Sequence, residues 1–364
     1  MSSPRSIAIV MAGGSGVKFW PRSTENHPKQ YMHMKGDGTM LQNTVNRLRR
    51  TFDNNDIYVV TYKSYEELTY SQLPDLPKEN VICEPFGRHT APAAGLAWAH
   101  IKEKYSDDDV FCVFPSDHII SNEREFNQSI ENAIKTASER QGIVTIGIAP
   151  TRPETQFGYI QINENPEDLG ELYEKGVRYA FTFAEKPDKN TAERFLESGD
   201  FLWNSGIFIL RMDTLIKSFR AYLPDHFEAF SLLAENVNSP DYEDILKSVY
   251  MRIDTISLDY GILEKAADVY CIESSFNWSD LETWDELYRL SMKDAKENVL
   301  EGDVISIDSR RSLVLSNGKL IGIHGLDDII VIDSDDALLV CKRGESEKIQ
   351  ELIDYMRRKN INKF

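Results

Sequence analysis

The chain has 364 residues, of which 41% are hydrophobic, so it can bury a full core and is too long for one small domain. Its 41 Lys and Arg against 59 Asp and Glu give a net charge of −18, which argues against nucleic acid or an anionic membrane as a partner. The four cysteines are scattered without metal-ligand spacing, and no apolar run reaches the ~18 residues of a membrane span. The composition predicts a soluble, cytoplasmic protein with reduced cysteines.

Short apolar runs alternate with helical patterns along most of the chain. We expect strands over 7–10, 57–61, 110–114, 143–148, 207–210 and 269–272, and helices over 39–50, 92–104, 126–140 and 189–198. This alternation predicts an α/β fold with a mostly parallel sheet and helices on both faces. In such sheets ligands bind beyond the carboxyl ends of the strands.

The first strand runs into Gly13-Gly14-Ser15-Gly16, where bare backbone N–H groups can approach an anion. Lys18 follows as a cation that can complete the neutralisation. The dinucleotide fingerprint of a Rossmann oxidoreductase needs a third glycine where Phe19 stands, and no Gly-Lys-Ser/Thr P-loop is present. Pro28 stiffens the chain just before Lys29, which suggests that Lys29 makes a second contact with an anion. The alternative is that Lys29 is a solvated surface lysine.

Two aspartates follow predicted strands. Strand 110–114 runs into Pro115-Ser116-Asp117, and the Asp117 carboxylate suits either a Mg²⁺ ligand or an Asx turn or helix cap. Asp280 follows strand 269–272 and supplies a second carboxylate from a distant segment. If the two met over a phosphate, they would form a metal clamp. His118 is expected to pack or hydrogen-bond locally.

Two further clusters suit a sugar phosphate. Glu185 can accept hydrogen bonds from hydroxyls while Lys186 faces a phosphate, although Glu-Lys is also a common surface pair. Asn204 follows an aromatic residue, Trp203, in a combination typical of polyol recognition, with a simple Asn-Ser-Gly turn as the alternative.

In chain order, these segments resemble the sugar-nucleotidyltransferase family, and within it the mannose-1-phosphate guanylyltransferases (GDP-mannose pyrophosphorylases). The motifs that carry the resemblance cover nearly the whole chain: Gly13 through Pro21, Pro28-Lys29-Gln30, Glu84 through Ala93, Pro115 through His118, Phe157 through Ile160, Glu185-Lys186-Pro187, Trp203 through Gly206, Leu258-Asp259-Tyr260 and Trp278 through Trp284.

The resemblance implies a Rossmann-like catalytic domain over 1–290 of the nucleotide-diphospho-sugar transferase type, whose sheet is mixed. It also implies a small C-terminal β-helix-like domain over 291–364 that can support a homodimer. Short apolar runs that begin near residues 304, 313, 320, 329 and 338 independently predict short strands there, followed by a helix over 346–358.

The resemblance further implies a role for each matching residue. Lys18, Lys29 and Asp117 would be catalytic, and Asp117 and Asp280 would bind Mg²⁺. The nucleotide GTP would contact Ala12, Gly13, Gly14, Ser15, Gly16, Lys18, Glu84, Pro85, Arg88, Thr90, Ser116 and Asp117. Mannose 1-phosphate would contact Gly158, Tyr159, Glu185, Lys186 and Asn204.

The implied reaction is attack of the ionised phosphate of mannose 1-phosphate on the α-phosphorus of GTP, which requires alignment and charge neutralisation but no covalent nucleophile. Three residues depart from the family pattern: Lys18 replaces arginine, His89 replaces asparagine and Glu282 replaces glycine. They leave two alternatives: a catalytically weak subunit that senses nucleotide sugars, or the same chemistry on another sugar 1-phosphate such as a heptose.

Overall fold

The structure of the chain, a computed structural model, describes residues 4–14, 16–163 and 169–361. The chain divides into two compact units. The first comprises Met1–Gly13 and Leu41–Ser279, and the second comprises Gly14–Met40 and Asp280–Phe364. The domain boundary expected near residue 290 stays a prediction.

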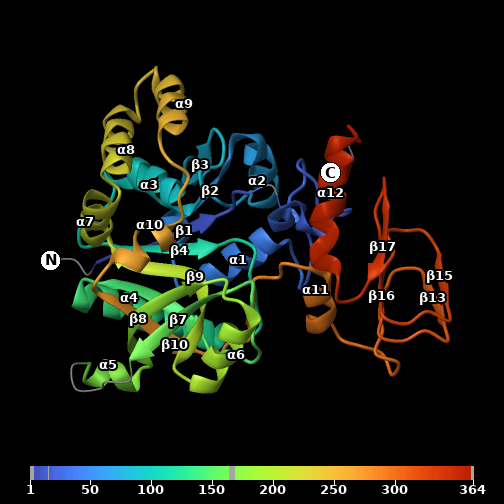
Figure 1. Cartoon of the computed structure of the whole chain (residues 1–364). Coiled ribbons are helices and arrows are strands. Elements are labelled where there is room, and N and C mark those ends of the chain that lie inside the picture. Colours follow the sequence, from blue (N-terminus) through green and yellow to red (C-terminus); the bar gives the residue numbers. More distant parts are fainter. Residues whose placement is uncertain (1–3, 15, 164–168, 362–364) are drawn as a thin grey trace. The chain divides into compact units, whose positions relative to one another are not determined.

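A nine-stranded sheet in the order β3-β2-β1-β4-β9-β6-β10-β8-β7 forms the centre of the first unit (Figure 1). Its strands are β1 (Ser6–Met11), β2 (Ile57–Tyr62), β3 (Val81–Glu84), β4 (Val110–Pro115), β6 (Ile143–Ile148), β7 (Gly158–Asn163), β8 (Val177–Glu185), β9 (Phe201–Arg211) and β10 (Val269–Ser274). Strands β1 to β4 pair in parallel, as do β6 and β10, whereas β9 is antiparallel to both β4 and β6. The mixed α/β sheet is therefore confirmed.

Helices cover both faces of this sheet (Figure 1). The helices are α1 (Met40–Leu48), α2 (Glu66–Gln72), α3 (Thr90–Ile101), α4 (Glu123–Arg140), α5 (Glu171–Glu174), α6 (Lys189–Ser198), α7 (Met212–Tyr222), α8 (Pro224–Asn236), α9 (Tyr242–Arg252) and α10 (Leu258–Gly261). Side chains alternate along β4, so Phe111 and Val113 join the core beneath α3 and α8, while Phe114 packs against Phe126 of α4 on the other face. Gly95 of α3 lets the Phe230 ring of α8 approach, because a Cβ there would lie 2.3 Å from that ring.

Strand β9 is longer than the sequence predicts. It begins at Phe201, six residues before the expected start at residue 207, so Asn204, Ser205 and Gly206 are strand residues and not a turn. The extra residues pair with β6 and β7, and the register shifts between Thr145 and Gly147 opposite them. Pairing on both edges stabilises a strand whose own sequence resembles a turn.

The second unit joins the segment 14–40 to the C-terminal part of the chain. It contains α11 (Trp284–Leu290), α12 (Ile349–Arg358), and the strands β12 (Val299–Glu301), β13 (Val304–Ile307), β14 (Leu313–Leu315), β15 (Ile321–His324), β16 (Ile329–Asp333) and β17 (Leu338–Lys342). The strands form two small sheets, β12-β14-β16-β17 and β13-β15, in which all neighbours are parallel except β16 and β17, which are antiparallel. Val314, Ile323 and Val331 form a small buried core there. The expected short strands and closing helix are confirmed.

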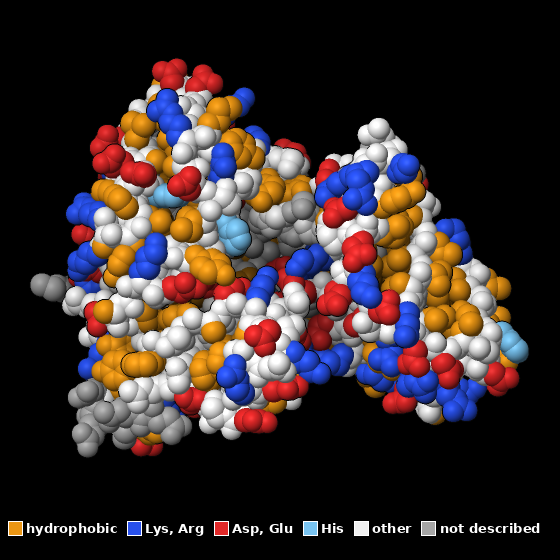
Figure 2. All heavy atoms as spheres, viewed as in Figure 1, with side chains coloured by type: hydrophobic (Ala, Val, Ile, Leu, Met, Phe, Trp, Pro, Cys, Tyr) orange, Lys and Arg blue, Asp and Glu red, His pale blue; other side chains and the backbone are white. Residues whose placement is uncertain are grey.

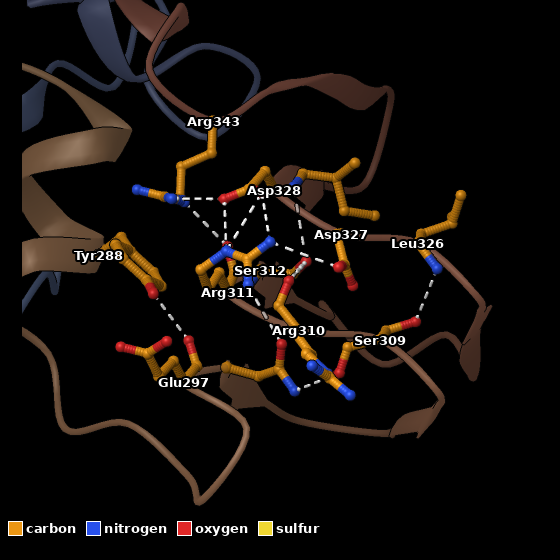
Figure 3. Close-up of polar contacts among 12 residues, drawn as sticks. Tyr288, Glu297, Ser309, Arg310, Arg311, Ser312, Leu326, Asp327, Asp328 and Arg343 are labelled. Atoms are coloured by element: carbon orange, nitrogen blue, oxygen red, sulfur yellow. Dashed lines mark hydrogen bonds and ion pairs between the residues drawn. The ribbon is translucent and has the colours of Figure 1, made fainter.

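An ion-pair network fixes one end of this β-helix-like part (Figure 3). Arg311 donates from Nε to both oxygens of the Asp328 carboxylate and from Nη2 to Oδ2, the last over 2.7 Å. Arg343 also contacts Asp328, and its Nε donates to the Arg311 carbonyl over 2.9 Å. These contacts hold the pKa of Asp328 below its usual range, chiefly through the hydrogen bonds from Arg311 and then Arg343.

The surface carries acidic and basic side chains on both units, and large apolar side chains are exposed on the β-helix-like part (Figure 2). Ile305 and Ile307 of β13 and Leu338 and Val340 of β17 are each at least half exposed. Among the described residues, no helix combines the length and apolar character needed to cross a membrane.

Candidate active site

The carboxyl ends of β1 and β4 bring two predicted groups of the first unit together. These strands are parallel neighbours with Met11 paired to Pro115, and the Ser116 amide donates to the Met11 carbonyl over 3.2 Å. Ala12 and Ser116 are buried, whereas Gly13 and Asp117 are only partly buried. The strand ends therefore place the start of the glycine segment beside the half-buried Asp117, as expected for a ligand edge.

Glu84 is a buried carboxyl at the end of β3. Its side chain accepts a hydrogen bond from the Tyr250 hydroxyl over 3.1 Å, and burial raises its pKa to about 8. A Cβ built on Gly13 would lie 3.5 Å from Glu84 Oε2 and 3.1 Å from the Tyr62 ring. The glycine thus lets the backbone of the loop lie close to a carboxyl that is mostly protonated at neutral pH.

Other residues predicted to line the nucleotide side hold the protein together. Arg88 donates to the Tyr250 carbonyl over 2.9 Å and to the Thr255 hydroxyl, and the Thr90 hydroxyl accepts from the Leu258 amide over 2.9 Å. Arg88 thereby joins the loop after β3 to α9 and the segment that follows it, and Thr90 joins the start of α3 to the start of α10. The nucleotide contacts expected of Pro85, Arg88 and Thr90 stay predictions.

Three residues predicted to bind the sugar phosphate lie close together in the first unit. A Cβ on Gly158 would lie 2.5 Å from Glu185 Oε2 and 3.4 Å from Asn204 Cβ, so the Gly158 backbone lies close to both side chains. These residues begin β7, end β8 and lie within β9, respectively. Pairing of the three strands therefore gathers one acidic and one amide side chain at one place.

Asp259, in the predicted motif Leu258-Asp259-Tyr260 but without a predicted role, is a partner of Asn204. Its Oδ1 accepts a hydrogen bond from the Asn204 amide over 2.7 Å, and the Asn204 carbonyl oxygen accepts from the Gly206 amide over 3.1 Å. Burial raises the pKa of Asp259, while the Asn204 hydrogen bond and the nearby His89 act to lower it. Both ends of the Asn204 amide are thereby oriented.

The remaining two residues of the predicted sugar group differ in exposure. Tyr159 is fully buried, and its hydroxyl both donates to the Glu154 carbonyl and accepts from the Glu154 amide. Lys186 is exposed and has a left-handed backbone with φ of 47°. Tyr159 supports the loop before β7, whereas the Lys186 ammonium is accessible to solvent.

The rest of the glycine segment belongs to the second unit, with Ser15 outside the described residues. Gly16 has φ of 52°, and a Cβ there would lie 2.6 Å from the Lys29 backbone nitrogen. The Gln30 amide donates to the Gly14 carbonyl over 3.1 Å. Glycine is therefore required at position 16 for its close approach to the segment 28–30.

Both predicted lysines contact the segment 280–282. Lys29 is 5% exposed, which excludes the solvated surface lysine, and its Nζ donates to the Asp280 carbonyl over 2.6 Å. The Lys18 ammonium forms an ion pair with the Glu282 carboxylate. Asp117 lies in the first unit and Asp280 in the second, so the pairing of their carboxylates stays a prediction.

Metal binding depends on which donor side chains gather in the fold. Among the described residues, no group of three or more His, Cys, Asp and Glu side chains could hold a metal ion unaided. One or two carboxylates bind Mg²⁺ when substrate phosphates supply further ligands, so the Mg²⁺ contacts expected of Asp117 and Asp280 stay predictions. The expected local role of His118 is confirmed, because its Nδ1 accepts a hydrogen bond from the Trp278 indole over 3.1 Å.

Residues 7–297 match the nucleotidyl transferase family, and residues 302–356 match the MannoseP isomerase/GMP-like β-helix domain. The chain therefore belongs to the nucleotidyl transferase family. Among its relatives is mannose-1-phosphate guanylyltransferase 2 of Escherichia coli O157:H7, 32% identical over 98% of this chain and 74% of that protein. The mannose-1-phosphate guanylyltransferase of Klebsiella pneumoniae is 33% identical over 98% of this chain and 75% of its own length.

A crystal structure from Thermus thermophilus resembles the whole chain. It is described as a mannose-1-phosphate geranyltransferase, is 27% identical in sequence and superposes with a TM-score of 0.86. The match covers 97% of this chain and 99% of that one, so it includes the C-terminal β-helix-like part. It agrees with the expected nucleotidyltransferase fold.

Proposed function

We propose that this protein is a mannose-1-phosphate guanylyltransferase, which transfers GMP from GTP to mannose 1-phosphate and releases pyrophosphate. The observation that carries the proposal is family membership over 7–297, together with relatives of that name about one third identical over nearly the whole chain. The gathered Gly158, Glu185 and Asn204 support it, because carboxylate and amide groups suit sugar hydroxyls.

Each proposed role follows from the position of a residue. Backbone N–H groups from Ala12 to Gly16 and the ammonium groups of Lys18 and Lys29 would bind the nucleotide phosphates. Lys186 would bind the phosphate of mannose 1-phosphate. Glu185 would accept hydrogen bonds from the mannose hydroxyls, and Asn204 would donate hydrogen bonds to them. The attacking phosphate is already ionised at neutral pH, so these residues have to align and neutralise charge and need not abstract a proton.

We assign metal binding to Asp117 in the first unit and Asp280 in the second. When bound, Mg²⁺ supplies positive charge that offsets the charge developing on the phosphates. The two carboxylates would hold and orient it, and Lys29 would be kept in place by its hydrogen bond to the Asp280 carbonyl.

A homodimer and a cytoplasmic location are also part of the proposal. The exposed Ile305, Ile307 and Val340 support an association between subunits, because exposed apolar side chains favour burial. Sedimentation of the purified chain would test it, and a monomer across micromolar concentrations would contradict it.

The direct test is pyrophosphate release from purified protein with GTP, mannose 1-phosphate and Mg²⁺. Parallel reactions would contain ATP or UTP, other sugar 1-phosphates including a heptose 1-phosphate, or EDTA. We expect metal-dependent release that is fastest with GTP and mannose 1-phosphate. Release mainly with a different sugar 1-phosphate would show that this sugar phosphate, and not mannose 1-phosphate, is the substrate. No release with any pair, together with binding of GDP-mannose, would indicate the nucleotide-sugar-sensing subunit.

A further inference from the structure

The ion pair between Lys18 and Glu282 depends on a well-packed part of the second unit. The 3₁₀ turn η1 (Val17–Phe19) buries Val17 and Phe19 and leaves Lys18 exposed between them. Phe19 packs edge-on against Trp284 with ring centroids 4.8 Å apart, and the Trp284 indole donates to the Trp20 carbonyl over 3.1 Å. The backbones on both sides of the ion pair are therefore fixed together.

The segment that carries Glu282 is kinked at the residue before it. Leu281 is fully buried and has φ of 45°, a left-handed conformation uncommon for a leucine. Anchoring this side chain fixes the backbone on both sides, where Asp280 holds Lys29 through its carbonyl and Glu282 holds Lys18 through its carboxylate. One short segment thus contacts both lysines of the proposed phosphate site.

Lys18 and Glu282, two residues that the resemblance marks as departures, are therefore partners of each other. They form one ion pair, whose side chains are 52% and 30% exposed. The Glu282 carboxylate offsets the positive charge of the Lys18 ammonium, which would otherwise attract a phosphate. Because the pair is partly exposed it is weak, so a bound polyanion can displace it.

We infer that Glu282 is a specificity-determining residue, which competes with the nucleotide polyphosphate for Lys18 and disfavours polyphosphate that carries no divalent cation. The inference rests on the proposed function, because it takes Lys18 as a phosphate ligand. A metal-free polyphosphate brings its full negative charge to the Glu282 carboxylate, in a chain with a net charge of −18. A divalent cation on the polyphosphate offsets part of that repulsion.

The test measures binding of inorganic tripolyphosphate by calorimetry, in EDTA and in excess Mg²⁺. Glu282→Gln and Glu282→Ala should each bind metal-free tripolyphosphate about three- to tenfold more tightly than wild type, with a smaller change in Mg²⁺. Asp37→Asn is the matched control, because Asp37 is an exposed acid of the same unit that forms no ion pair among the described residues. It makes the same change in net charge and should leave the affinity within about twofold.

A second variant separates competition for Lys18 from a general effect of charge. Glu282→Gln should raise the logarithm of the affinity for metal-free tripolyphosphate in the Lys18→Met background by less than half as much as it does in the wild-type background. Unchanged or weaker binding by both Glu282 variants, an equal gain in the Lys18→Met background, or no tripolyphosphate binding by any protein would each overturn the inference. Tighter binding by the Glu282 variants of a protein that releases no pyrophosphate would instead contradict the proposed function alone.

Discussion

At the scale of single residues, Glu84 couples stability to pH. Its pKa is raised by burial to about 8, so the folded protein keeps a proton that the unfolded chain loses near its ordinary pKa of 4.5. The contribution of Glu84 to the free energy of unfolding is fully present below pH ~4.5 and is lost as the pH rises toward ~8. Over two pH units within this window the loss is about 2 to 3 kcal/mol, since one unit corresponds to about 1.4 kcal/mol.

Glu84→Gln removes that dependence, because an amide does not titrate and its oxygen can still accept from the Tyr250 hydroxyl. We expect the variant to gain stability relative to wild type as pH rises from 5.5 to 7.5, measured by urea unfolding at both values. Identical pH dependence in the two proteins would show that Glu84 does not keep its proton.

Asp259 should act on the sugar phosphate through Asn204. Asp259→Ala removes the acceptor of a 2.7 Å hydrogen bond and frees the Asn204 amide to rotate. We expect KM for mannose 1-phosphate to rise about tenfold, which corresponds to the loss of one hydrogen bond to a charged group, with KM for GTP little changed. Asp259→Asn keeps an acceptor oxygen and should restore most of the affinity. Equal effects of both variants on both KM values would contradict the positioning role.

The proposed metal ligands give a third prediction. Asp117→Asn and Asp280→Asn keep size and remove the charge that attracts the cation, so each should lower pyrophosphate release by about a hundredfold or more. Thermal unfolding midpoints should stay close to that of wild type, because both side chains are only partly buried. Near-normal turnover of either variant in Mg²⁺ would remove that residue from the metal site.

The residues of the site were predictable where the signal is local. Gly13 and Asp117 each lie two residues after an apolar strand, and adjacent parallel strands place them at one edge of the sheet. The partners of these residues were not predictable, because Tyr250 is 166 positions from Glu84, and Glu282 is 264 positions from Lys18. Nothing in the local sequence around either residue indicates such a contact.

At the scale of elements, the close approach of η1 and the segment 28–30 depends on Gly16, the residue that precedes η1. Gly16→Ala places a methyl group 2.6 Å from the Lys29 backbone nitrogen, so the two segments must separate. Gly14→Ala is a matched control, since Gly14 also has a positive φ but a Cβ there meets nothing within 4 Å. Both variants place alanine at a position with positive φ, which destabilises each of them. Only in Gly16→Ala does the added methyl group also overlap with the Lys29 backbone nitrogen.

We therefore expect Gly16→Ala to be less stable than Gly14→Ala by about 1 to 3 kcal/mol, the usual cost of overpacking. Urea unfolding followed by tryptophan fluorescence measures this difference, because Trp20 and Trp284 lie in the same unit. Equal stability of the two variants would mean that the segments separate without cost.

Periodicity predicts the elements of this chain better than their extents. The buried strands β4 and β6 and the amphipathic helix α4 lie close to where their apolar patterns place them. The pattern fails for β9, whose first half contains Asn204-Ser205-Gly206 and depends on pairing with β6 and β7. Pairing between distant strands overrides local turn preference there, and it is this half of β9 that carries Asn204.

At the scale of the whole molecule, the N-terminal segment 14–40 belongs with the last part of the chain. Motif order does not reveal this, because the long segment Leu41–Ser279 of the first unit separates the two parts in sequence. The contacts responsible are specific. Arg22 donates from Nε to the Asp333 carbonyl and from Nη2 to the Ser316 carbonyl, both over 3.2 Å. A single side chain therefore links the proposed phosphate-binding segment to two turns of the β-helix-like part.

Arg22→Ala should loosen the segment 16–31 and the ends of β14 and β16 together. The change removes two charge-assisted hydrogen bonds and leaves two carbonyls without this donor, at a cost of about 2 kcal/mol. Hydrogen exchange should become faster in both regions, and Arg22→Lys, which keeps the charge with fewer donors, should give a smaller increase. If exchange in 16–31 stays at the wild-type rate while β14 and β16 exchange faster, the segment is held by its packing around Trp20 and Trp284 and not by Arg22.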